Sequence, residues 1–589
     1  MDALKRKARK WLAAVWLPVK HNFTFFFFMY LLGLSCIMTI NGYGKHIAVF
    51  ELFIDLYAVC LLLYWLPARF MAWVRGCVYA LSYLLALVDM FCYLKFGSPI
   101  SFNLLQVCVQ TNPREATEAL ATYVTLGSFA SPLIAVPIIM LLNVLFAVRK
   151  VRLPFLEKGY DWCFGLASVA VMAYGIGAWA TDKAYCYYNA IAADDSLELQ
   201  YNVDKPHCAG FYIAVYRLAH AANCLYVADR EVRDIEGRVG KTAPQGCSFR
   251  SSNIVLIIGE ATTRHHLHLY GYPKPTTPRQ DSLAATGLLV PFADVVSPHN
   301  QTSEVFKTAF STYSYGMDGS WYEYPLFTEL MKNAGYNVTF ITNQFVKKPN
   351  ADIFDFCGGL FLNTDKLSRA QFSHRNTRPH EYDEGLLADY DSLKAYATGR
   401  NFVIFHLLGC HTAYDARYPR QFDVFKKADY NRPDLDADGM KNLAAYDNAV
   451  LYNDYIVAEI IKRFEDEDAI VIYMPDHGEM AFMGSSTYGR TLNVTTQNEV
   501  YQQFDIPFWI YVTPKYREAH GDIYAQMLAA KARPFMTDAI DQVILYLAGV
   551  ETQYYDSRKN ILSPDFDASR KRLIMGGIDY DSFMQGYRP

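Results

Sequence analysis

The first 180 residues contain five long apolar segments, which restrict the possible folds more than any other feature of this sequence. The segments are Phe23 to Ile40, Ala48 to Leu66, Gly76 to Leu94, Leu126 to Val148 and Trp162 to Ala180. A helix needs about 20 apolar residues to cross the hydrocarbon core of a bilayer. The sequence therefore predicts an N-terminal domain of five transmembrane helices.

The basic residues between these segments predict which side of the membrane each loop occupies. Lys and Arg cluster before the first segment and after the second and fourth, whereas the alternate loops contain only Lys45, Lys95 and Arg114. Because Lys and Arg accumulate in cytoplasmic loops, we expect a cytoplasmic amino terminus and an opposite location for everything after Ala180. No small-residue cleavage site follows the first segment, which favours a retained anchor over a signal peptide.

From Ser251 onward, short β-rich runs alternate with helical patterns. The predicted strands are Asn253 to Ile258, Leu289 to Val296, Tyr336 to Thr342, Phe402 to Leu408, Ala469 to Met474 and Ile506 to Val512. Such alternation predicts a largely parallel sheet with helices on both faces.

Three parts of the chain follow from these patterns. We expect a transmembrane domain over residues 1–180, a connector over 181–250 and an α/β catalytic domain over 251–589. The connector contains an amphipathic stretch, Phe211 to Tyr226, that suits a helix lying on the membrane surface or packed against protein.

The composition excludes one class of partner. The 589 residues carry a formal net charge of -4, so the chain lacks the basic surface of nucleic-acid-binding proteins, and we expect no nucleic-acid partner. Several cysteines would lie in an oxidising compartment outside the membrane. They are Cys186, Cys208, Cys224, Cys247, Cys357 and Cys410. Their pairing, or their presence as free thiols, is left open.

Two predicted strands end in residues with metal-ligand chemistry. Asn253 to Ile258 leads into Glu260, and Ala469 to Met474 leads into Asp476 and His477. Parallel strands present their carboxyl ends at one edge of a sheet, so we expect two carboxylates and an imidazole to meet there. This ligand set suits Zn²⁺ or a similar divalent ion.

Thr302 is the candidate nucleophile and fourth ligand. It follows the run Leu289 to Val296 and begins a helical pattern. A metal ion makes a threonine hydroxyl more reactive, and the first amides of a helix bind phosphate. His406 and His411, at and beyond the end of another predicted strand, are candidates to stabilise phosphoryl oxygens or to transfer a proton.

These strings resemble the phosphoethanolamine transferases of the alkaline-phosphatase and sulfatase superfamily along nearly the whole chain. The matching strings, besides the apolar segments and Thr302, are Thr111-Asn112-Pro113-Arg114-Glu115-Ala116, Ile258-Gly259-Glu260-Ala261-Thr262-Thr263-Arg264, Leu269-Tyr270-Gly271-Tyr272-Pro273, Arg417-Tyr418-Pro419, Tyr446-Asp447-Asn448 and Asp476-His477-Gly478-Glu479. The implied fold is a multi-domain membrane protein with five transmembrane helices and an alkaline-phosphatase-like α/β domain around a largely parallel sheet.

The resemblance also implies roles for single residues. Glu260, Thr302, Asp476 and His477 bind zinc in this interpretation, Thr302 carries the transferred group, and His411 lies near the phosphate or a second metal. Some members have another histidine about a dozen residues after the Asp-His pair, whereas the stretch 480–492 contains none. One zinc ion is therefore expected, a second is in doubt, and Mn²⁺ is the less favoured metal.

The implied activity is transfer of phosphoethanolamine from phosphatidylethanolamine to a cell-envelope acceptor through a covalent Thr302 intermediate. Lipopolysaccharide is the expected acceptor, at its core heptose or lipid A, and Gly489-Arg490 resembles the core-modifying branch. We expect a monomer in the bacterial inner membrane, with several crossings and a periplasmic catalytic domain. Glu51, Asn112 and Glu115 are candidate ligands for the donor headgroup.

The sequence leaves two alternative activities open and disfavours a sulfatase and a non-catalytic receptor. A glycerophosphate transferase or polymerase, or a phosphodiesterase, would use the same superfamily site. A sulfatase that makes formylglycine needs a C/S-x-P-x-R string, which this sequence lacks. A receptor that had lost catalysis would be expected to lack some of the four candidate ligands, and all four are present.

Overall fold

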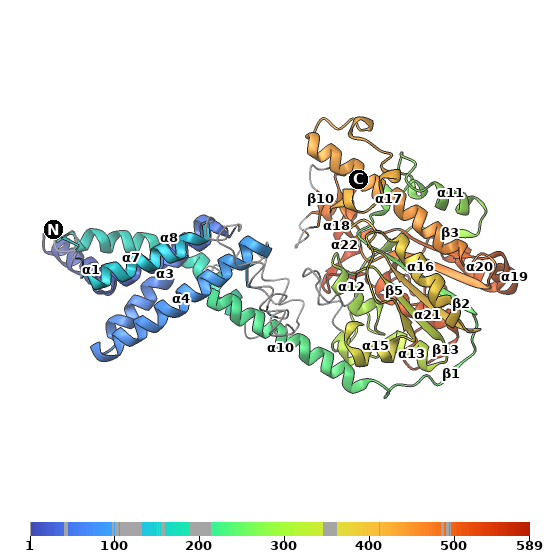
Figure 1. The fold of residues 1–589 in the computed structure, drawn as a ribbon, viewed down its shortest axis with the longest axis horizontal. Helices are drawn as coiled ribbons and strands as arrows, with labels where there is room; N and C mark the ends of the chain where they lie inside the picture. The colour runs from blue at the N-terminus through green and yellow to red at the C-terminus, as the bar shows by residue number, and fades with distance from the viewer. Residues whose placement is uncertain are drawn as a thin grey trace. The chain divides into compact units, whose positions relative to one another are not determined.

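The chain folds into two compact units, Met1–Asp229 and Arg230–Pro589. The computed structural model describes residues 2–40, 45–96, 99–100, 105, 132–149, 151, 153–154, 159–187, 214–344, 362–411, 413–484, 488–490, 494 and 496–588. The division falls inside helix α10 (Ala214–Arg238), which is drawn in green in Figure 1. The predicted boundaries at residues 180 and 250 stay predictions.

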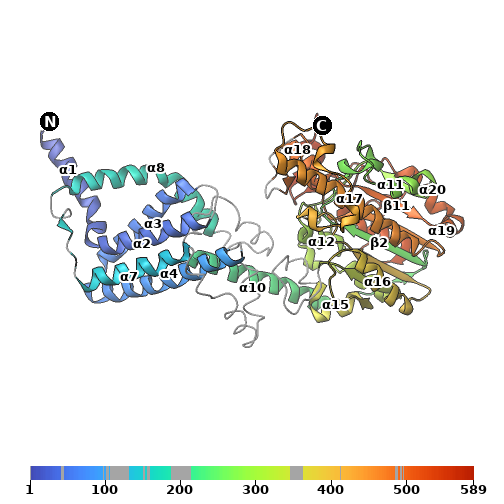
Figure 2. The ribbon, with the colours of Figure 1, turned by 45° about the horizontal axis from the view of Figure 1, so that its top comes forward.

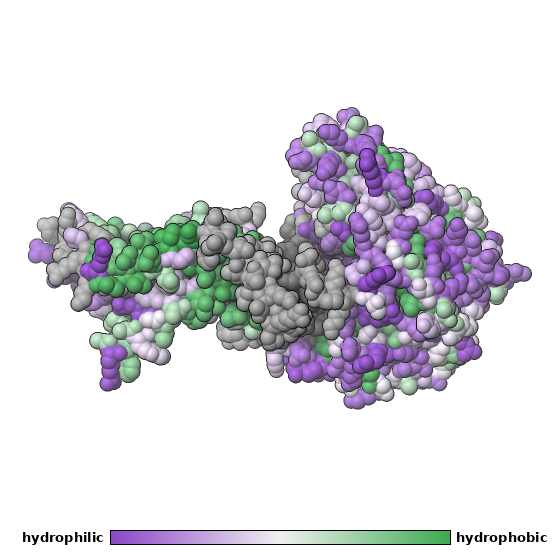
Figure 3. All heavy atoms as spheres, viewed as in Figure 1, coloured by the Kyte–Doolittle hydropathy of each residue, from purple (hydrophilic) through white to green (hydrophobic). Residues whose placement is uncertain are grey.

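Besides the start of α10, the described part of the first unit is built from one amphipathic helix, α1 (Asp2–His21), and several apolar helices. The apolar helices are α2 (Phe23–Thr39), α3 (Lys45–Trp65), α4 (Ala68–Phe96), α7 (Ala135–Val148) and α8 (Asp161–Tyr187). The stretches His46–Trp65, Ala68–Leu94 and Asp161–Ala184 are long and apolar enough to cross a membrane. Hydrophobic residues cover much of the visible surface of this unit, whereas the second unit is mostly hydrophilic (Figure 3).

The predicted count of five crossings stays a prediction. Helices α1 and α2 are bent by 74° relative to each other. Only together are they long and apolar enough to cross a membrane. The predicted fourth segment is described only from Pro132, and Pro132–Val148 is shorter than a full crossing. The described residues thus provide three spans, or four if the bent pair is one span.

Helix α1 is an element that the apolar pattern alone did not predict. One face of it is apolar, with Trp16 and Val19 buried, and packs along α8, where Trp16 stacks on Phe164 with ring centroids 5.1 Å apart. The polar face carries Lys20, whose Nζ lies 2.7 Å from Asp161 Oδ2. Its many basic residues lower the mean hydropathy and so hide a helix that amphipathic packing stabilises.

A seven-stranded sheet organises the second unit, with the strand order β3-β11-β8-β2-β7-β5-β6. The strands are β2 (Asn253–Gly259), β3 (Leu289–Phe292), β5 (Asn337–Thr342), β6 (His374–Arg375), β7 (Asn401–His406), β8 (Ala469–Pro475) and β11 (Phe508–Val512). Strand β2 is parallel to both β7 and β8, whereas β11 runs antiparallel to β3 and β8. The expectation of a largely parallel sheet is confirmed, with β11 as a reversed strand.

Both faces of this sheet are covered, as the continuous apolar strands predict. Ile254, Leu256 and Ile258 face a core shared with helices α12 (Thr302–Ala309), α13 (Phe327–Asn333) and α21 (Ile540–Ala548). Val255 and Ile257 face a second core shared with α16 (Glu384–Leu393) and α17 (Ala437–Lys462), two helices that run beside the sheet in Figure 2. The fold class is that of the prediction: a membrane unit followed by an α/β unit.

Three predicted strands differ from the observed ones by two residues or more, and one of them is β11, which starts at Phe508 instead of Ile506. The run from 289 to 296 divides after Phe292, and β4 (Val295–Val296) pairs with β12 (Phe535–Met536) outside the central sheet. Strand β7 ends at His406, two residues before the predicted end. The amides of Leu408 and Gly409 donate to the Asp383 carboxylate instead of to a neighbouring strand, which ends the ladder.

Candidate metal centre

The two carboxylates expected at the sheet edge come from neighbouring parallel strands in register. Gly259 of β2 is opposite Pro475 of β8, and the Asp476 amide donates to the Gly259 carbonyl at 3.0 Å. Glu260 and Asp476 therefore leave the sheet side by side. Strand β2 is the central strand of the sheet, between β8 and β7.

Glu260, Asp476 and His477 converge on one point. All three are fully buried, and one ligand atom of each lies within 4.8 Å of the others. His477 Nε2 is 3.5 Å from Glu260 Oε1 and 3.2 Å from Asp476 Oδ2. These two carboxylate oxygens have no hydrogen-bond donor among the described residues, and burying such charge is costly unless a cation balances it.

The protonation of this cluster suits a metal. The Nδ1 of His477 is 2.7 Å from the Gly478 carbonyl, so Nδ1 carries the proton and Nε2 presents its lone pair. Burial and the nearby Arg490 lower the pKa of His477 to about 3, which keeps the ring neutral. Burial and the Glu260 carboxylate raise the pKa of Asp476. The residues therefore fit a divalent ion, which would replace a proton on the carboxylate pair.

The Glu260 carboxyl is the more acidic of the two. Burial raises the pKa of Glu260, but the electrostatic influence of the His477 ring, His411 and Arg490 outweighs burial and lowers this pKa overall. Its Oε2 accepts hydrogen bonds from Thr302 Oγ1 at 3.1 Å and from Gln344 Nε2 at 3.0 Å. Oε1 therefore remains directed at His477.

Thr302 begins helix α12 and is nearly fully buried, with 4% of its surface exposed. The preceding loop is fixed because Asn300 Nδ2 donates to Gln503 Oε1 at 2.9 Å. The Thr302 hydroxyl lies beside the carboxylate cluster. The first backbone amides of α12 are in position to bind a phosphoryl group. The structure thus brings the four predicted ligands together: Glu260, Thr302, Asp476 and His477.

Asp383 shapes the loop that carries His411. Its carboxylate is buried and accepts from the amides of Leu408 at 2.8 Å and Gly409 at 2.9 Å. Gly409 has φ +49, and a Cβ at this position would lie 2.9 Å from the Glu260 amide nitrogen. Only glycine lets the loop pass this close to the first ligand.

Replacing Asp383 with asparagine tests this support. One loop amide then faces an NH₂ group instead of an acceptor, so we expect a loss of about 1–3 kcal/mol in unfolding free energy. The isosteric control is Asp391→Asn on α16, the helix that Asp383 precedes, where an exposed carboxylate pairs with Arg463 at 2.9 Å. Thermal unfolding of both variants checks the expectation, and equal stabilities would contradict it.

The two predicted histidines have different surroundings. His406 is fully buried between aromatic rings, 4.8 Å from the Phe306 centroid, and its Nδ1 is 3.0 Å from Thr342 Oγ1. Burial lowers the pKa of His406 to about 4. His411 is partly exposed and lies close enough to act electrostatically on Glu260. The geometry favours His411 over His406 for contact with a substrate.

The headgroup candidates are only partly described. Asn112 and Glu115 lie outside the described residues. Glu51 is fully buried in the first unit, and Asp55, one turn later, accepts from Trp179 Nε1 at 2.8 Å and from Lys183 Nζ at 2.7 Å. Of the candidate disulfide cysteines, Cys247 and Cys410 are free thiols, and nothing is described of the pairing of the rest.

Gln344 and Asp383 are site residues that the sequence did not single out. Gln344 follows β5, and its Nε2 donates both to Glu260 and to the Leu407 carbonyl, the latter at 2.7 Å. The available signal was the position of Gln344 just beyond a predicted strand at the same sheet edge. Asp383 offered no such signal, because an acidic residue before a helix is usually a cap.

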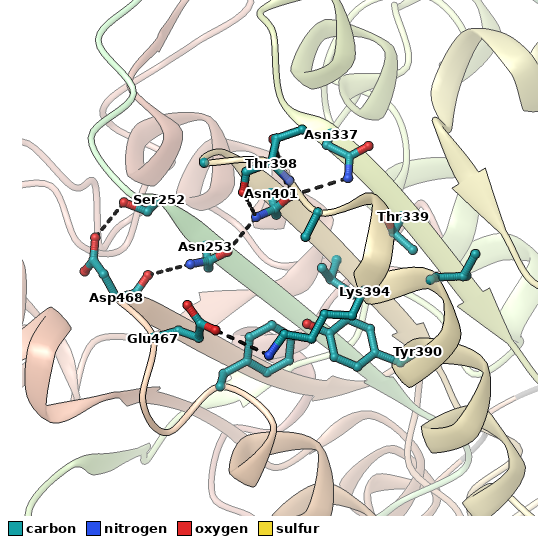
Figure 4. A pocket seen from close by; sticks show the side chains of 15 residues that line it. Ser252, Asn253, Asn337, Thr339, Tyr390, Lys394, Thr398, Asn401, Glu467 and Asp468 are labelled. Carbon is teal, nitrogen blue, oxygen red and sulfur yellow. Dashed lines mark hydrogen bonds and ion pairs between the residues drawn. The ribbon is translucent and has the colours of Figure 1, made fainter.

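A separate pocket of about 310 Å³ lies at the amino ends of the parallel strands, the sheet edge opposite to Glu260. Its polar side chains bond to one another (Figure 4). Asn401 Nδ2 donates to Asn253 Oδ1 at 2.8 Å, and Ser252 Oγ donates to Asp468 Oδ2 at 2.7 Å. These bonds tie strand starts together, which gives the pocket a structural explanation.

Known proteins with similar sequences are phosphoethanolamine transferases, and a sulfatase family model matches part of the chain. The family model described as Sulfatase matches residues 252–539. The chain is 26% identical over 576 residues to phosphoethanolamine transferase EptC of Escherichia coli K12, covering 95% of each protein. It is 28% identical over 519 residues to phosphoethanolamine transferase CptA of Salmonella typhimurium LT2, covering 84% of each.

Solved structures resemble the second unit. The crystal structure of the C-terminal periplasmic domain of EcEptC from Escherichia coli aligns with a TM-score of 0.50 at 28% identity, over 57% of this chain and 94% of that domain. The complex of the same domain with Zn aligns with a TM-score of 0.50 at 27% identity, over 59% of this chain and 98% of that domain.

Proposed function

Because this chain belongs to the phosphoethanolamine transferases of the sulfatase superfamily, we propose that it moves phosphoethanolamine from a membrane phospholipid to a lipopolysaccharide acceptor. The observation that carries the proposal is the contact of Thr302 Oγ1 with Glu260 inside a buried cluster of metal-ligand atoms. A hydroxyl beside such a cluster, at the start of a helix, is placed for attack on phosphorus.

The metal in this proposal is zinc, held by Glu260, Asp476, His477 and Thr302. The zinc complex of the related EcEptC domain supports this choice of ion. Bound there, zinc supplies Lewis-acid chemistry, since it lowers the pKa of a hydroxyl and offsets charge on phosphoryl oxygens. The proposal includes one ion, and the number of ions is open to measurement.

The residues of this chain then divide the reaction into two steps. Thr302 Oγ1 attacks the phosphorus of the donor diester, and the diacylglycerol oxygen leaves with a proton. The acceptor oxygen next attacks the phosphorus on Thr302 and regenerates the hydroxyl. His411 is the proposed proton donor and acceptor for these oxygens. Gln344 and Asp383 hold Glu260 and the His411 loop in position.

Donor and location follow from the same proposal. Phosphatidylethanolamine is the proposed donor, the bacterial inner membrane the proposed site of a multi-pass anchor, and the periplasm the proposed compartment of the second unit. The apolar helices of the first unit and the relation to a periplasmic domain of EcEptC support this. Glu51 remains a proposed ligand for the donor ammonium, because it is acidic and lies one helical turn before Asp55, which itself binds the Lys183 ammonium at 2.7 Å.

Donor choice tests the proposal against its nearest alternative. The purified full-length chain is incubated with lipopolysaccharide and with phosphatidylethanolamine or phosphatidylglycerol of identical acyl chains, each labelled in the headgroup. We expect label in lipopolysaccharide from the ethanolamine lipid only. Label from the glycerol lipid would indicate a glycerophosphate transferase, and soluble labelled product without acceptor label would indicate a phosphodiesterase.

A further inference from the structure

Arg490 lies beside the candidate metal centre although the mechanism above does not use it. It directly follows β10 (Tyr488–Gly489), which pairs antiparallel with β9 (Met480–Ala481). In this register Gly489 is opposite Met480, so Arg490 comes next to Glu479. Its Nη1 is 2.9 Å from His477 Nε2, and its Nε is 3.7 Å from Glu479 Oε2.

Glu479 gives this arginine a fixed anchor. The Glu479 side chain is fully buried, and Tyr414 donates its hydroxyl proton to Oε1 at 2.6 Å. The other oxygen, Oε2, has no hydrogen-bond partner among the described residues and faces the guanidinium. A buried carboxylate of this kind needs a nearby cation, so the Arg490 head is held at the rim of the cluster.

The acidic groups at the reacting site and the negative charge of the donor favour an additional positively charged group there. Glu260, Asp476 and Glu479 are buried acidic groups, and a donor diester brings another negative charge. A single divalent ion balances only two of these charges. The stretch 480–492 contains no histidine that would hold a second ion, whereas it does contain Arg490.

We propose that Arg490 binds the nonbridging oxygens of the phosphoryl group transferred to and from Thr302, in the role that a second metal ion would otherwise fill. The inference rests on the proposed function of this site. If His477 Nε2 held a metal ion, Arg490 Nη1, which lies 2.9 Å from this nitrogen, would no longer donate to it. The planar guanidinium, held by Glu479, then offers two parallel N–H donors that match phosphate geometry.

The expected role is stabilisation of charge in the transition state, so loss of this donor should slow transfer more than it weakens metal binding. For Arg490→Gln we expect a fall of about 10²–10³-fold in the rate of Thr302 modification. Zinc content should equal that of the wild type, because Arg490 is not a ligand in this proposal. Arg490→Lys, which keeps the charge without the fork, should be intermediate, and added guanidinium should partly restore the glutamine variant.

A binding measurement separates this inference from the proposed function. Calorimetric titration of the zinc-loaded full chain with free phosphoethanolamine needs no transfer, and we expect Arg490→Gln to weaken binding about tenfold or more. The control is Arg558→Gln, an exposed arginine paired with Asp556 at 3.0 Å, which should match the wild type.

Equal binding and equal transfer rates in Arg490→Gln would overturn the inference, and so would loss of zinc from that variant. Failure of the proposed function has a different signature. In that case calorimetry still shows tighter binding of phosphoethanolamine to the wild type than to Arg490→Gln. Thr302, however, is not modified in either protein.

Discussion

Thr302→Ala is expected to abolish transfer, with a rate loss of about 10⁴-fold or more, because nothing replaces a nucleophile at this position. Thr302→Ser keeps the hydroxyl that contacts Glu260 and should keep measurable activity. Zinc content should fall less in the serine variant than in the alanine variant, since the hydroxyl is also a proposed ligand. Transfer of headgroup label to lipopolysaccharide measures the activity of each variant.

The matched control for this experiment lies on the same helix. Thr308 is also buried, but its hydroxyl donates to the Val305 carbonyl at 3.0 Å instead of to a carboxylate of the cluster. Thr308→Ala should therefore transfer at a rate near that of the wild type. Substantial transfer by Thr302→Ala would sink the nucleophile assignment, whatever the behaviour of the control.

Glu260→Gln is expected to remove the metal. The glutamine keeps the size of the side chain and its contact with Thr302 but loses the negative charge that a divalent ion requires. Changes in groups that merely orient metal ligands cost about 10–100-fold in affinity, so loss of a ligand itself should cost more. Zinc content after dialysis against a mild chelator, and the rise in melting temperature on adding zinc, should both fall toward zero.

Glu329→Gln is the control for charge removal at a buried glutamate. Glu329 is also buried, and its carboxylate accepts from the Gly240 amide at 2.7 Å, on an element remote from the carboxylate cluster. The Glu329→Gln variant should keep its full zinc content even if its free energy of unfolding is lower than that of the wild type. Full zinc content in Glu260→Gln would show that the ligand assignment is wrong.

The sequence predicted the carboxyl ends of β2 and β8 well because each ligand follows directly after a strand. Continuous runs of apolar and β-branched residues identify buried parallel strands. Because parallel strands present their carboxyl ends at one edge of the sheet, Glu260 and Asp476 were expected to lie close together although they are far apart in the sequence. Thr302 could be added because it begins a helix after another strand. These predictions needed no knowledge of side-chain contacts.

Gln344, Asp383 and Arg490 show where that reasoning ends. Each acts through a side-chain contact with a residue far along the chain or across a short hairpin, and polar residues in loops carry no periodic signal. Asp383 also explains why β7 is shorter than predicted, since its carboxylate takes two amides from the ladder. Helix α1 was missed for a related reason, because its basic face conceals its apolar one.

The covalent link between Thr302 and the transferred phosphoethanolamine is the central step of the proposed reaction. The direct measurement is tandem mass spectrometry of peptides from the full-length zinc-loaded protein, after incubation with headgroup-labelled phosphatidylethanolamine and without acceptor. We predict labelled phosphoethanolamine on Thr302, which disappears when lipopolysaccharide is added. Label on another residue, or labelled lipopolysaccharide formed while Thr302 stays unmodified, would contradict the account.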